Sequence, residues 1–340
     1  MVKDKKEHYD RYGWTVDEEN LKTLPAYASE SAKKLTQWLT LEGRRKLLVE
    51  WISHCQEDGR IHGKFWPIGA WTGRMSHSAP NQANIPSFSK DLPKNPVEEI
   101  KYRYDADMRG LWGTKDPDVY LVGTDAEGIQ LRLLAHYMKS PAYVEAICSG
   151  DKKLGTDIHS MNMRALGPIC KTRDDAKTFI YAFLLGASIP KVAEILSCSS
   201  KQASEAVNNF LTALPELKRL KEVKIPYDAS KGFFIGLDGR KVPCDSTHLM
   251  LAGYLQNGES VVMKHACIKW RTEAKAAGIK FKQVDFVHDE WQTECHGALE
   301  EAEELGRLQC KAIEWAGKEL ELFCPLSGET KIGRNWRDTH

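Results

Sequence analysis

Two aspartates, Asp125 and Asp289, are the residues whose types and settings most directly suggest chemistry. Asp125 follows the apolar run 120–124, and Asp289 stands in the turn 288–290 between two strand-like stretches. Two carboxylates that a fold brings together cannot both stay ionised unless a cation joins them. The pair therefore predicts a site for Mg²⁺, which prefers oxygen ligands, and two such ions suit in-line phosphoryl transfer.

A basic helix is expected over residues 172–186, between the two aspartates in the sequence, with Thr172 as its N-cap and Gly186 at its C-terminal end. It carries Arg173, Lys177 and Tyr181 at four-residue spacing, so that all three share one helix face. The eight residues from the first to the third rise about 12 Å, close to the length of a nucleoside triphosphate. Arginine suits a bidentate contact with phosphate, and lysine supplies a point charge. Taken alone, the same pattern also describes a solvated stripe on an amphipathic helix.

A third candidate is the polar segment 72–86, which surrounds Arg74 with hydrogen-bonding side chains. Such a loop can hold a phosphate or the edge of a nucleic-acid groove. Standing alone, it is equally an ordinary surface loop. An isolated aspartate after a strand is likewise most often a helix N-cap, so these motifs gain meaning only together.

Composition limits the classes of function. The chain has 340 residues, with 48 basic and 47 acidic side chains and a net charge of +1, so a basic groove would need local clustering. Its nine cysteines are scattered, which favours reduced thiols over a disulfide framework or zinc site. No apolar run approaches the roughly 20 residues of a membrane span, and the N-terminus lacks a signal-peptide core. We therefore expect a cytoplasmic protein that is independent of membranes.

Apolar periodicity predicts an α+β fold in which strands flank a helical middle. The expected helices cover residues 28–57, 127–138, 157–220, 247–277 and 297–320. A buried strand is expected over 117–124, hairpins over 232–243 and 281–295, and short strands and turns over 58–86. Strands from distant segments would therefore form one sheet around an inserted helical lobe.

In collinear order these segments resemble the motifs of family A DNA polymerases, in particular those of the replicative polymerases of short-tailed bacteriophages. The matching segments are Thr72–Pro86, Asp125–Arg132, Asp157–His159, Arg173–Tyr181, Gly236–Val242, Val287–Glu290 and 331–340. The resemblance covers about residues 45–340. It implies a right-hand palm, built of an antiparallel sheet with helices, and an inserted helical fingers lobe.

The resemblance also implies a division of the chain. Residues 1–60 would be an N-terminal helical segment, 61–138 the first part of the palm, 139–250 the fingers and 251–340 the second part of the palm. The stretch before Thr72 is too short for the family's thumb and 3′–5′ exonuclease domains, which are expected to be absent or rudimentary. We therefore expect a split enzyme, in which a second chain supplies both, and the N-terminal segment is a thumb base or a docking segment.

Roles for individual residues follow from the resemblance alone. The expected metal ligands, for two Mg²⁺ with Mn²⁺ as a substitute, are Asp125, Asp289 and the backbone of Ala126. The expected catalytic set is Asp125, Asp289, Glu290 and Lys177, the lysine as proton donor to pyrophosphate. The expected nucleotide-binding residues are His159, Arg173, Lys177, Tyr181 and Gln130. The expected contacts with the primer terminus or the minor groove are Arg74, Gln256 and His288.

Three positions depart from the family pattern. Gln130 stands where the family has a glutamate that screens out the ribose 2′-hydroxyl, so weaker ribonucleotide exclusion is expected. Leu185 replaces a usual tyrosine, which removes an aromatic ring beside the template base and predicts either relaxed fidelity or a substitute ring from elsewhere in the chain. Ala252 replaces a usual asparagine and removes one polar contact with the duplex.

The expected function is a template-directed DNA polymerase core that adds deoxynucleotides to a primer, with primer-template DNA, a second chain and a processivity factor as partners. One alternative is a single-subunit RNA polymerase or primase-like enzyme, which the run 128–130 resembles. The segment 72–86 and Tyr181 argue against it. Another alternative is a non-catalytic DNA-binding assembly subunit. Retention of both aspartates, Arg173 and Lys177 argues against that, since a decayed site would have lost at least one.

Overall fold

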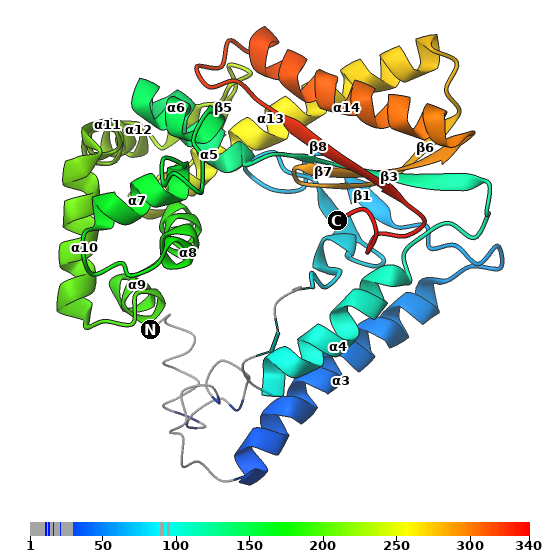
Figure 1. Ribbon diagram of the computed structural model, residues 1–340, viewed down its shortest axis with the longest axis horizontal. Helices are drawn as coiled ribbons and strands as arrows, with labels where there is room; N and C mark the ends of the chain where they lie inside the picture. The colour runs from blue at the N-terminus through cyan, green and yellow to red at the C-terminus, as the bar shows by residue number, and fades with distance from the viewer. Residues whose placement is uncertain are drawn as a thin grey trace. The chain divides into compact units, whose positions relative to one another are not determined.

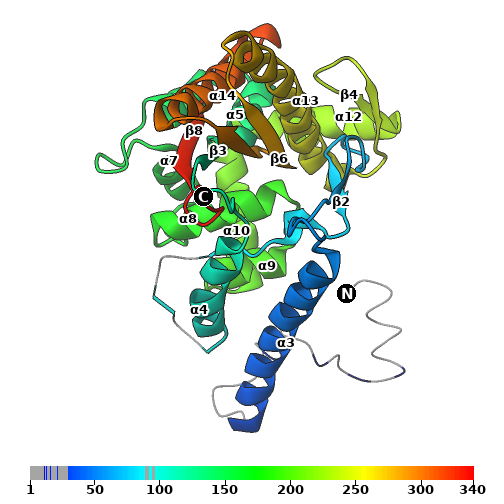
Figure 2. The same ribbon diagram turned by 90° about the vertical axis from the view of Figure 1, so that its right-hand side faces the viewer.

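The computed structural model describes residues 30–88, 92–93 and 96–340, together with the single positions 11, 13, 16 and 21. These residues fall into two compact units. The first takes its described residues from 1–65, 77–116 and 333–340, and the second from 66–76 and 117–332. Figure 1 and Figure 2 show the chain in two views at right angles.

The second unit is built on a four-stranded sheet in the order β6-β7-β3-β8. Its strands are β3 (Val119–Ala126), β6 (Phe281–Val287), β7 (Glu290–His296) and β8 (Gly328–Gly333). β7 lies antiparallel to both β3 and β6. All of β7 except its last residue is buried, as expected for a strand inside a sheet that is covered by helices.

Two long helices, α13 (Thr247–Ala276) and α14 (Leu299–Glu319), lie together over this sheet (Figure 1). α14 packs on β3 and β7, and α13 packs on α14 and on α5 (Ile129–Met138). The rings of Trp270 on α13 and Trp291 on β7 are 5.8 Å apart and fully buried, so they join helix and sheet in one core. This core fixes the strand ends on which the aspartates stand.

A helical lobe is inserted between α5 and α13. It contains α6 (Pro141–Cys148), α7 (Ile158–Leu166), α8 (Arg173–Leu184), α9 (Ile189–Ile195), α10 (Ser200–Ala213), α11 (Pro215–Arg219), the π-helix η2 (Leu220–Lys224), α12 (Ile225–Ser230), and the strands β4 (Phe233–Ile235) and β5 (Lys241–Pro243). Phe179, Phe183 and Phe210 pack edge-on or tilted at 5.1 to 5.5 Å and form the centre of the lobe.

The first unit contains α3 (Glu30–His54), η1 (Gln82–Asn84), α4 (Pro96–Gly110) and most of the short pair β1 (Lys64–Trp66) and β2 (Ser76–Ser78). Arg44 on α3 donates two hydrogen bonds, of 2.7 and 2.9 Å, to the buried carboxylate of Asp105 on α4. α3 also leaves large apolar side chains in solvent, among them Trp38 (57% exposed) and Ile52 (72%). No helix in the described part of the chain is long and apolar enough to cross a membrane.

Candidate active site

The sheet brings the two aspartates together, although 289 − 125 = 164 positions separate them in the sequence. Asp125 is opposite Glu290 in the register of β3 and β7, and the N–H of Ala126 donates to the carbonyl of Asp289 at 2.9 Å. Asp289 occupies the two-residue turn between β6 and β7 with His288, whose φ of +55° is in the left-handed region. Such sparsely populated backbone conformations concentrate at functional sites.

Loss of solvation, and then the negative charge of neighbouring carboxylates, raises the pKa of both aspartates. For Asp125, loss of solvation and then the carboxylates of Glu290, Glu329 and Glu259 raise the pKa to about 7. For Asp289, loss of solvation, then Glu259 and Asp125, raise the pKa well above its ordinary value. The two carboxylates therefore hold an excess of negative charge that a bound cation would relieve.

A third carboxylate, Glu259 on α13, belongs to the same site. Its side chain is fully buried and accepts two hydrogen bonds of 2.7 Å from the guanidinium of Arg74. It also accepts a hydrogen bond of 3.3 Å from the side-chain amide of Gln130 on α5. The sequence reading missed Glu259. The available signal was an acid on a long helix with apolar runs on both sides of the polar segment 256–260, because an unpaired glutamate is almost never buried.

The loop that carries Arg74 is tied to α13 at several points. Asn257 donates from Nδ2 to the carbonyl of Thr72 at 3.1 Å. Ser260 donates to the carbonyl of Gly73 at 2.6 Å. Gly73 itself has a φ of +89°, which glycine adopts without strain. The start of the predicted segment, residues 72–74, is therefore fixed to the helix that holds Glu259.

α8 brings Tyr181 near the aspartates. The hydroxyl of Thr172 accepts the N–H of Asp175 at 3.0 Å, which caps the helix as predicted. Burial, then the charges of Asp289 and Asp125, raise the pKa of the Tyr181 hydroxyl, so this ring lies within electrostatic reach of both acids. The end of the helix that carries Tyr181 is therefore close to the predicted metal-binding pair.

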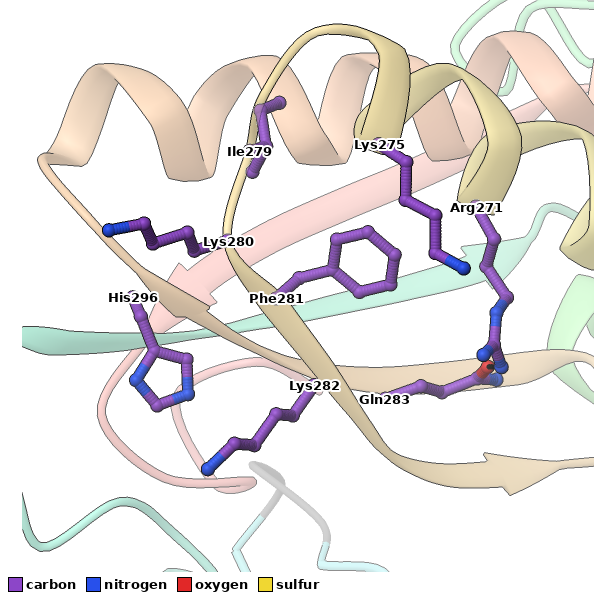
Figure 3. Close-up of a pocket in the computed structure, with 8 residues that line it drawn as sticks. All are labelled: Arg271, Lys275, Ile279, Lys280, Phe281, Lys282, Gln283 and His296. Carbon is purple, nitrogen blue, oxygen red and sulfur yellow. Dashed lines mark hydrogen bonds between the residues drawn. The ribbon is translucent and has the colours of Figure 1, made fainter.

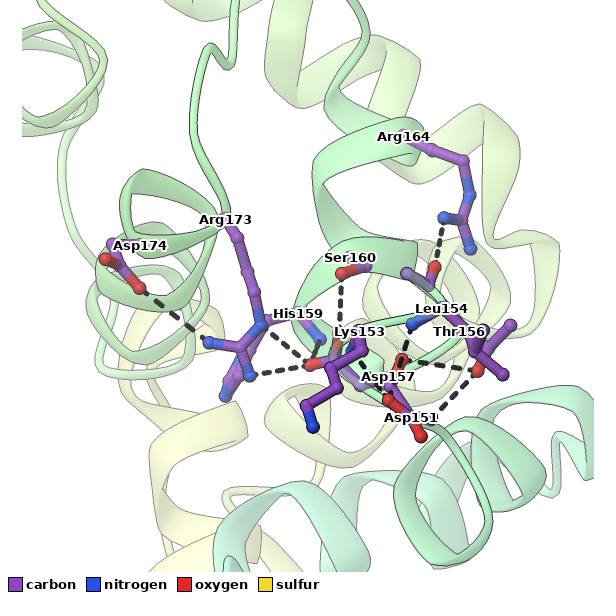
Figure 4. Close-up of polar contacts among 11 residues, drawn as sticks. Asp151, Lys153, Leu154, Thr156, Asp157, His159, Ser160, Arg164, Arg173 and Asp174 are labelled. Atoms are coloured by element: carbon purple, nitrogen blue, oxygen red, sulfur yellow. Dashed lines mark hydrogen bonds and ion pairs between the residues drawn. The ribbon is translucent and has the colours of Figure 1, made fainter.

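Asp157 holds the side chain of Arg173 at the start of α8 and the N-terminus of α7 (Figure 4). It caps α7 by accepting the N–H of His159, and it accepts hydrogen bonds from Ser160 and from Nε and Nη2 of Arg173 at 3.0 and 2.7 Å. Burial opposes ionisation of Asp157, but the bonds from Arg173 and Ser160 outweigh it and hold its pKa below the usual range. From the sequence, Asp157 is expected only as part of the segment Asp157–His159, and no individual role is predicted for it.

His159 is uncharged near neutral pH in this setting. Burial, then the nearby charge of Arg173, lowers the pKa of its imidazole, and Lys177 contributes in the same direction. The ring centroid of His159 lies 6.3 Å from that of Tyr181. His159, Arg173, Lys177 and Tyr181 are thus brought into one neighbourhood.

The remaining candidates occupy the rim of the site or its surroundings. Glu290 is buried opposite Asp125 on β7 and accepts a hydrogen bond from Gln292 at 2.5 Å. Gln256 is half-buried on α13, one helical turn before Glu259, and His288 is half-buried in the β6–β7 turn. Leu185, at the end of α8, is 55% exposed.

A variant series at Asp157 separates capping from charge pairing. Asparagine caps helices as well as aspartate does, so Asp157→Asn should keep the cap and lose the ion pair with Arg173, together with the oxygen that accepts from Ser160. We expect the KM for nucleotide in primer extension to rise about tenfold, with a smaller change in kcat. Asp157→Ala should lose the cap as well and unfold more easily, by a further 1 kcal/mol or so. Equal KM values for Asp157→Asn and the unaltered protein would show that the pair does not position Arg173.

The donor chemistry of the site fits a hard cation. Among the described residues, no group of three or more His, Cys, Asp or Glu side chains is arranged to hold a metal ion. The two aspartates offer oxygen ligands only, and Mg²⁺ is commonly held by one or two carboxylates, with water and substrate phosphates completing its shell. Asp125 and Asp289 therefore suit a metal that arrives with its substrate.

A basic pocket of about 600 Å³ lies away from this site (Figure 3). It is lined by Arg271, Lys275, Ile279, Lys280, Phe281, Lys282, Gln283 and His296. It lies at the start of β6, roughly 20 Å of strand from the turn that holds Asp289. Lys275 stands in the last turn of α13, where a cation complements the helix dipole, so part of this charge stabilises the helix.

The chain is similar to known DNA polymerases. The family model described as DNA polymerase family A matches residues 1–338. The DNA-directed DNA polymerases of Enterobacteria phage T3 and Escherichia phage T7 are each 32% identical over 313 residues, which span 85% of this chain and 42% of each relative. The chain thus spans less than half the length of these relatives.

The solved structures include a clear match in fold. The POL domain of Pol1 from M. smegmatis, in complex with DNA primer-template and dNTP, matches with a TM-score of 0.80 at 21% identity. The match covers 97% of this chain and 57% of that one. The predicted α+β class, with antiparallel sheets and helices, is confirmed.

Proposed function

The chain belongs to DNA polymerase family A, and on that premise we propose that it is a template-directed DNA polymerase core. It would add deoxynucleotides to the 3′-hydroxyl of a primer. The observation that carries the proposal is the pair Asp125 and Asp289, side by side at strand ends and under mutual charge repulsion. Such a pair suits phosphoryl transfer because it concentrates negative charge where cations and phosphates must meet.

Asp125 and Asp289 would hold two Mg²⁺ ions, or Mn²⁺ in their place, with the backbone carbonyl of Ala126 as a further ligand. When bound, the ions would supply Lewis-acid stabilisation of charge on the attacking and leaving oxygens. The residues of the chain fix the geometry. The β3–β7 register sets Asp125 opposite buried Glu290, and the hydrogen bond from the N–H of Ala126 to the carbonyl of Asp289 ties the end of β3 to the turn that carries Asp289.

The face of α8 would bind the triphosphate. Arg173, held by Asp157, keeps a guanidinium at the N-terminal end of the helix, where the helix dipole also favours anions. Lys177 is exposed one turn further along and is the candidate proton donor to pyrophosphate. Neutral His159 can donate a hydrogen bond to phosphate, and Tyr181 would pack near the sugar.

The primer-template would meet the Arg74 loop, Gln256 on α13 and His288 in the β6–β7 turn. These three residues belong to elements that converge on the aspartates, and Arg74 is oriented by Glu259. Base and sugar edges in a minor groove offer mainly acceptors, which arginine and glutamine donors suit.

Primer extension with matched nucleotide sets tests the proposal. The purified chain, with Mg²⁺ and a recessed primer, should add deoxynucleotides in the order that the template dictates, and EDTA should stop the reaction. Addition of ribonucleotides with equal efficiency would favour an RNA-polymerase or primase-like function. Binding of the primer-template without addition of either set would favour a non-catalytic assembly subunit.

We also propose that the chain is the polymerase part of a split enzyme, whose second chain supplies a thumb and a 3′–5′ exonuclease. The exposed apolar side chains of α3, among them Trp38 and Ile52, support this, because such a patch marks a docking surface. Trp38→Ser should abolish co-purification of that chain from the native host while template-directed addition by the purified core persists. Highly processive synthesis by the purified chain alone would contradict the split arrangement.

A further inference from the structure

We propose that Glu259 is a positioning residue for nucleotide selection, which fixes Gln130 and couples it to Arg74. This inference rests on the proposed polymerase function and deepens it. Gln130 is neutral where a carboxylate is usual for this family, and the structure places a carboxylate against it from another element. In this chain the negative charge beside the position that screens out the ribose 2′-hydroxyl thus comes from Glu259 on α13, which lies within hydrogen-bonding distance of Gln130 on α5.

The hydrogen bonds converge on one oxygen. Oε2 of Glu259 accepts Nη2 of Arg74 at 2.7 Å and Nε2 of Gln130 at 3.3 Å, while its Oε1 accepts Nε of Arg74 at 2.7 Å. The carboxylate is fully buried, and the side chain of Arg74 is 15% exposed. Any displacement of Arg74 must therefore disturb the acceptor that Gln130 uses.

The carboxylate also determines how the amide of Gln130 is turned. A carboxylate only accepts hydrogen bonds, so Gln130 must present its NH₂ group to Glu259 and turn its carbonyl oxygen away. Without the negative charge, the amide could turn over at little energetic expense. Glu259 therefore selects one of two nearly isosteric surfaces that Gln130 could offer to a nucleotide sugar.

The base of this arrangement is rigid. Asn257 and Ser260, which flank Glu259 on α13, hold the carbonyls of Thr72 and Gly73 just before Arg74. A Cβ atom on Gly253, further back on the same helix, would come within 2.6 Å of the Trp71 ring, so loop and helix are in close contact there. These contacts prevent the loop from moving away from α13. They therefore keep Arg74 in place against Glu259.

A charge-transposition cycle tests the inference. The measured quantity is the ratio of kcat/KM for a deoxynucleotide to that for the matching ribonucleotide, in single-nucleotide addition. Glu259→Gln should lower this ratio about tenfold, the value of one hydrogen bond to a charged group. Gln130→Glu should lower deoxynucleotide kcat/KM about tenfold, because two carboxylates would face each other.

The double variant Gln130→Glu, Glu259→Gln restores one carboxylate and one amide in exchanged positions, facing each other as in the starting protein. The deoxynucleotide-to-ribonucleotide ratio and the deoxynucleotide kcat/KM should both return to within about threefold of their values in the starting protein. A merely structural role for Glu259 could not produce this recovery. The matched control is Glu273→Gln, on the same helix but paired with Lys269 away from the site, and it should change neither.

Each outcome bears on one claim. If the unaltered chain adds neither nucleotide, the proposed function fails, whatever Glu259 does. If it adds deoxynucleotides but Glu259→Gln keeps the ratio, or if the double variant is as impaired as the two single changes combined, the role of Glu259 is overturned. Should Glu259→Gln fail to fold, recovery of Gln130→Glu in the double variant still supports the inference, and lack of recovery overturns it.

Discussion

Replacement of Asp289 by asparagine is expected to lower primer extension by about three orders of magnitude or more while making the metal-free protein more stable. The loss of activity follows from the loss of a charged oxygen ligand at the centre of the site. The gain in stability follows because asparagine removes a carboxylate that loss of solvation, Glu259 and Asp125 all oppose. The checks are single-nucleotide addition with Mg²⁺ and thermal unfolding in EDTA at pH 8.

The stability gain should depend on pH with a definite sign. The folded protein holds a proton on Asp125 up to a pKa of about 7, whereas the unfolded chain releases it near 4. The folded state therefore binds more protons between these values, and the metal-free protein loses stability as pH rises through that window. Asp289→Asn should flatten this decline, and the exposed control Asp245→Asn should leave it in place. A variant that is less stable than the starting protein at pH 8 in EDTA would contradict the charge crowding.

Replacement of Arg74 by alanine is expected to destabilise the protein by about 3 kcal/mol or more, a large effect for one residue of a loop. The change leaves the fully buried carboxylate of Glu259 without its guanidinium, and an uncompensated buried charge is strongly destabilising. The measurement is the free energy of unfolding in urea.

A second substitution, at Glu259, tests whether the buried carboxylate causes the loss of stability in Arg74→Ala. Glu259→Gln in the Arg74→Ala background removes the stranded charge and should recover at least half of the lost stability. Arg45→Ala serves as the control, because the Arg45 side chain is 61% exposed and pairs with Glu42 on the same helix, and it should cost far less stability than Arg74→Ala. If the double variant were less stable than Arg74→Ala, desolvation of Glu259 would not be the source of the effect.

The elements with strong local signals could be predicted from the sequence. The apolar run before Asp125 is β3, and the hairpin predicted over 281–295 is β6 and β7, with the turn where it was expected. The helix that carries Arg173 begins at its predicted cap and ends just before Gly186, whose φ is +81°. Local periodicity and end signals suffice for such elements.

The elements and contacts that were missed depend on tertiary packing. α4 was not predicted, because only a few widely spaced apolar residues such as Ile100 and Met108 are buried on it. β8 was not predicted either, since its polar sequence becomes a strand by pairing with β3. The roles of Glu259 and Asp157 come from partners distant in the sequence, Arg74 and Arg173, and no local pattern reports such pairings.

Single-turnover addition of one nucleotide to a primer tests the polymerase proposal most directly. With Mg²⁺, the chain should add the deoxynucleotide complementary to the template base and discriminate against the other three. Asp125→Asn should reduce that rate by at least about three orders of magnitude, and Asp245→Asn should not change it. Addition that ignores the template base, or a rate that survives Asp125→Asn, would contradict a template-directed polymerase built on these two aspartates.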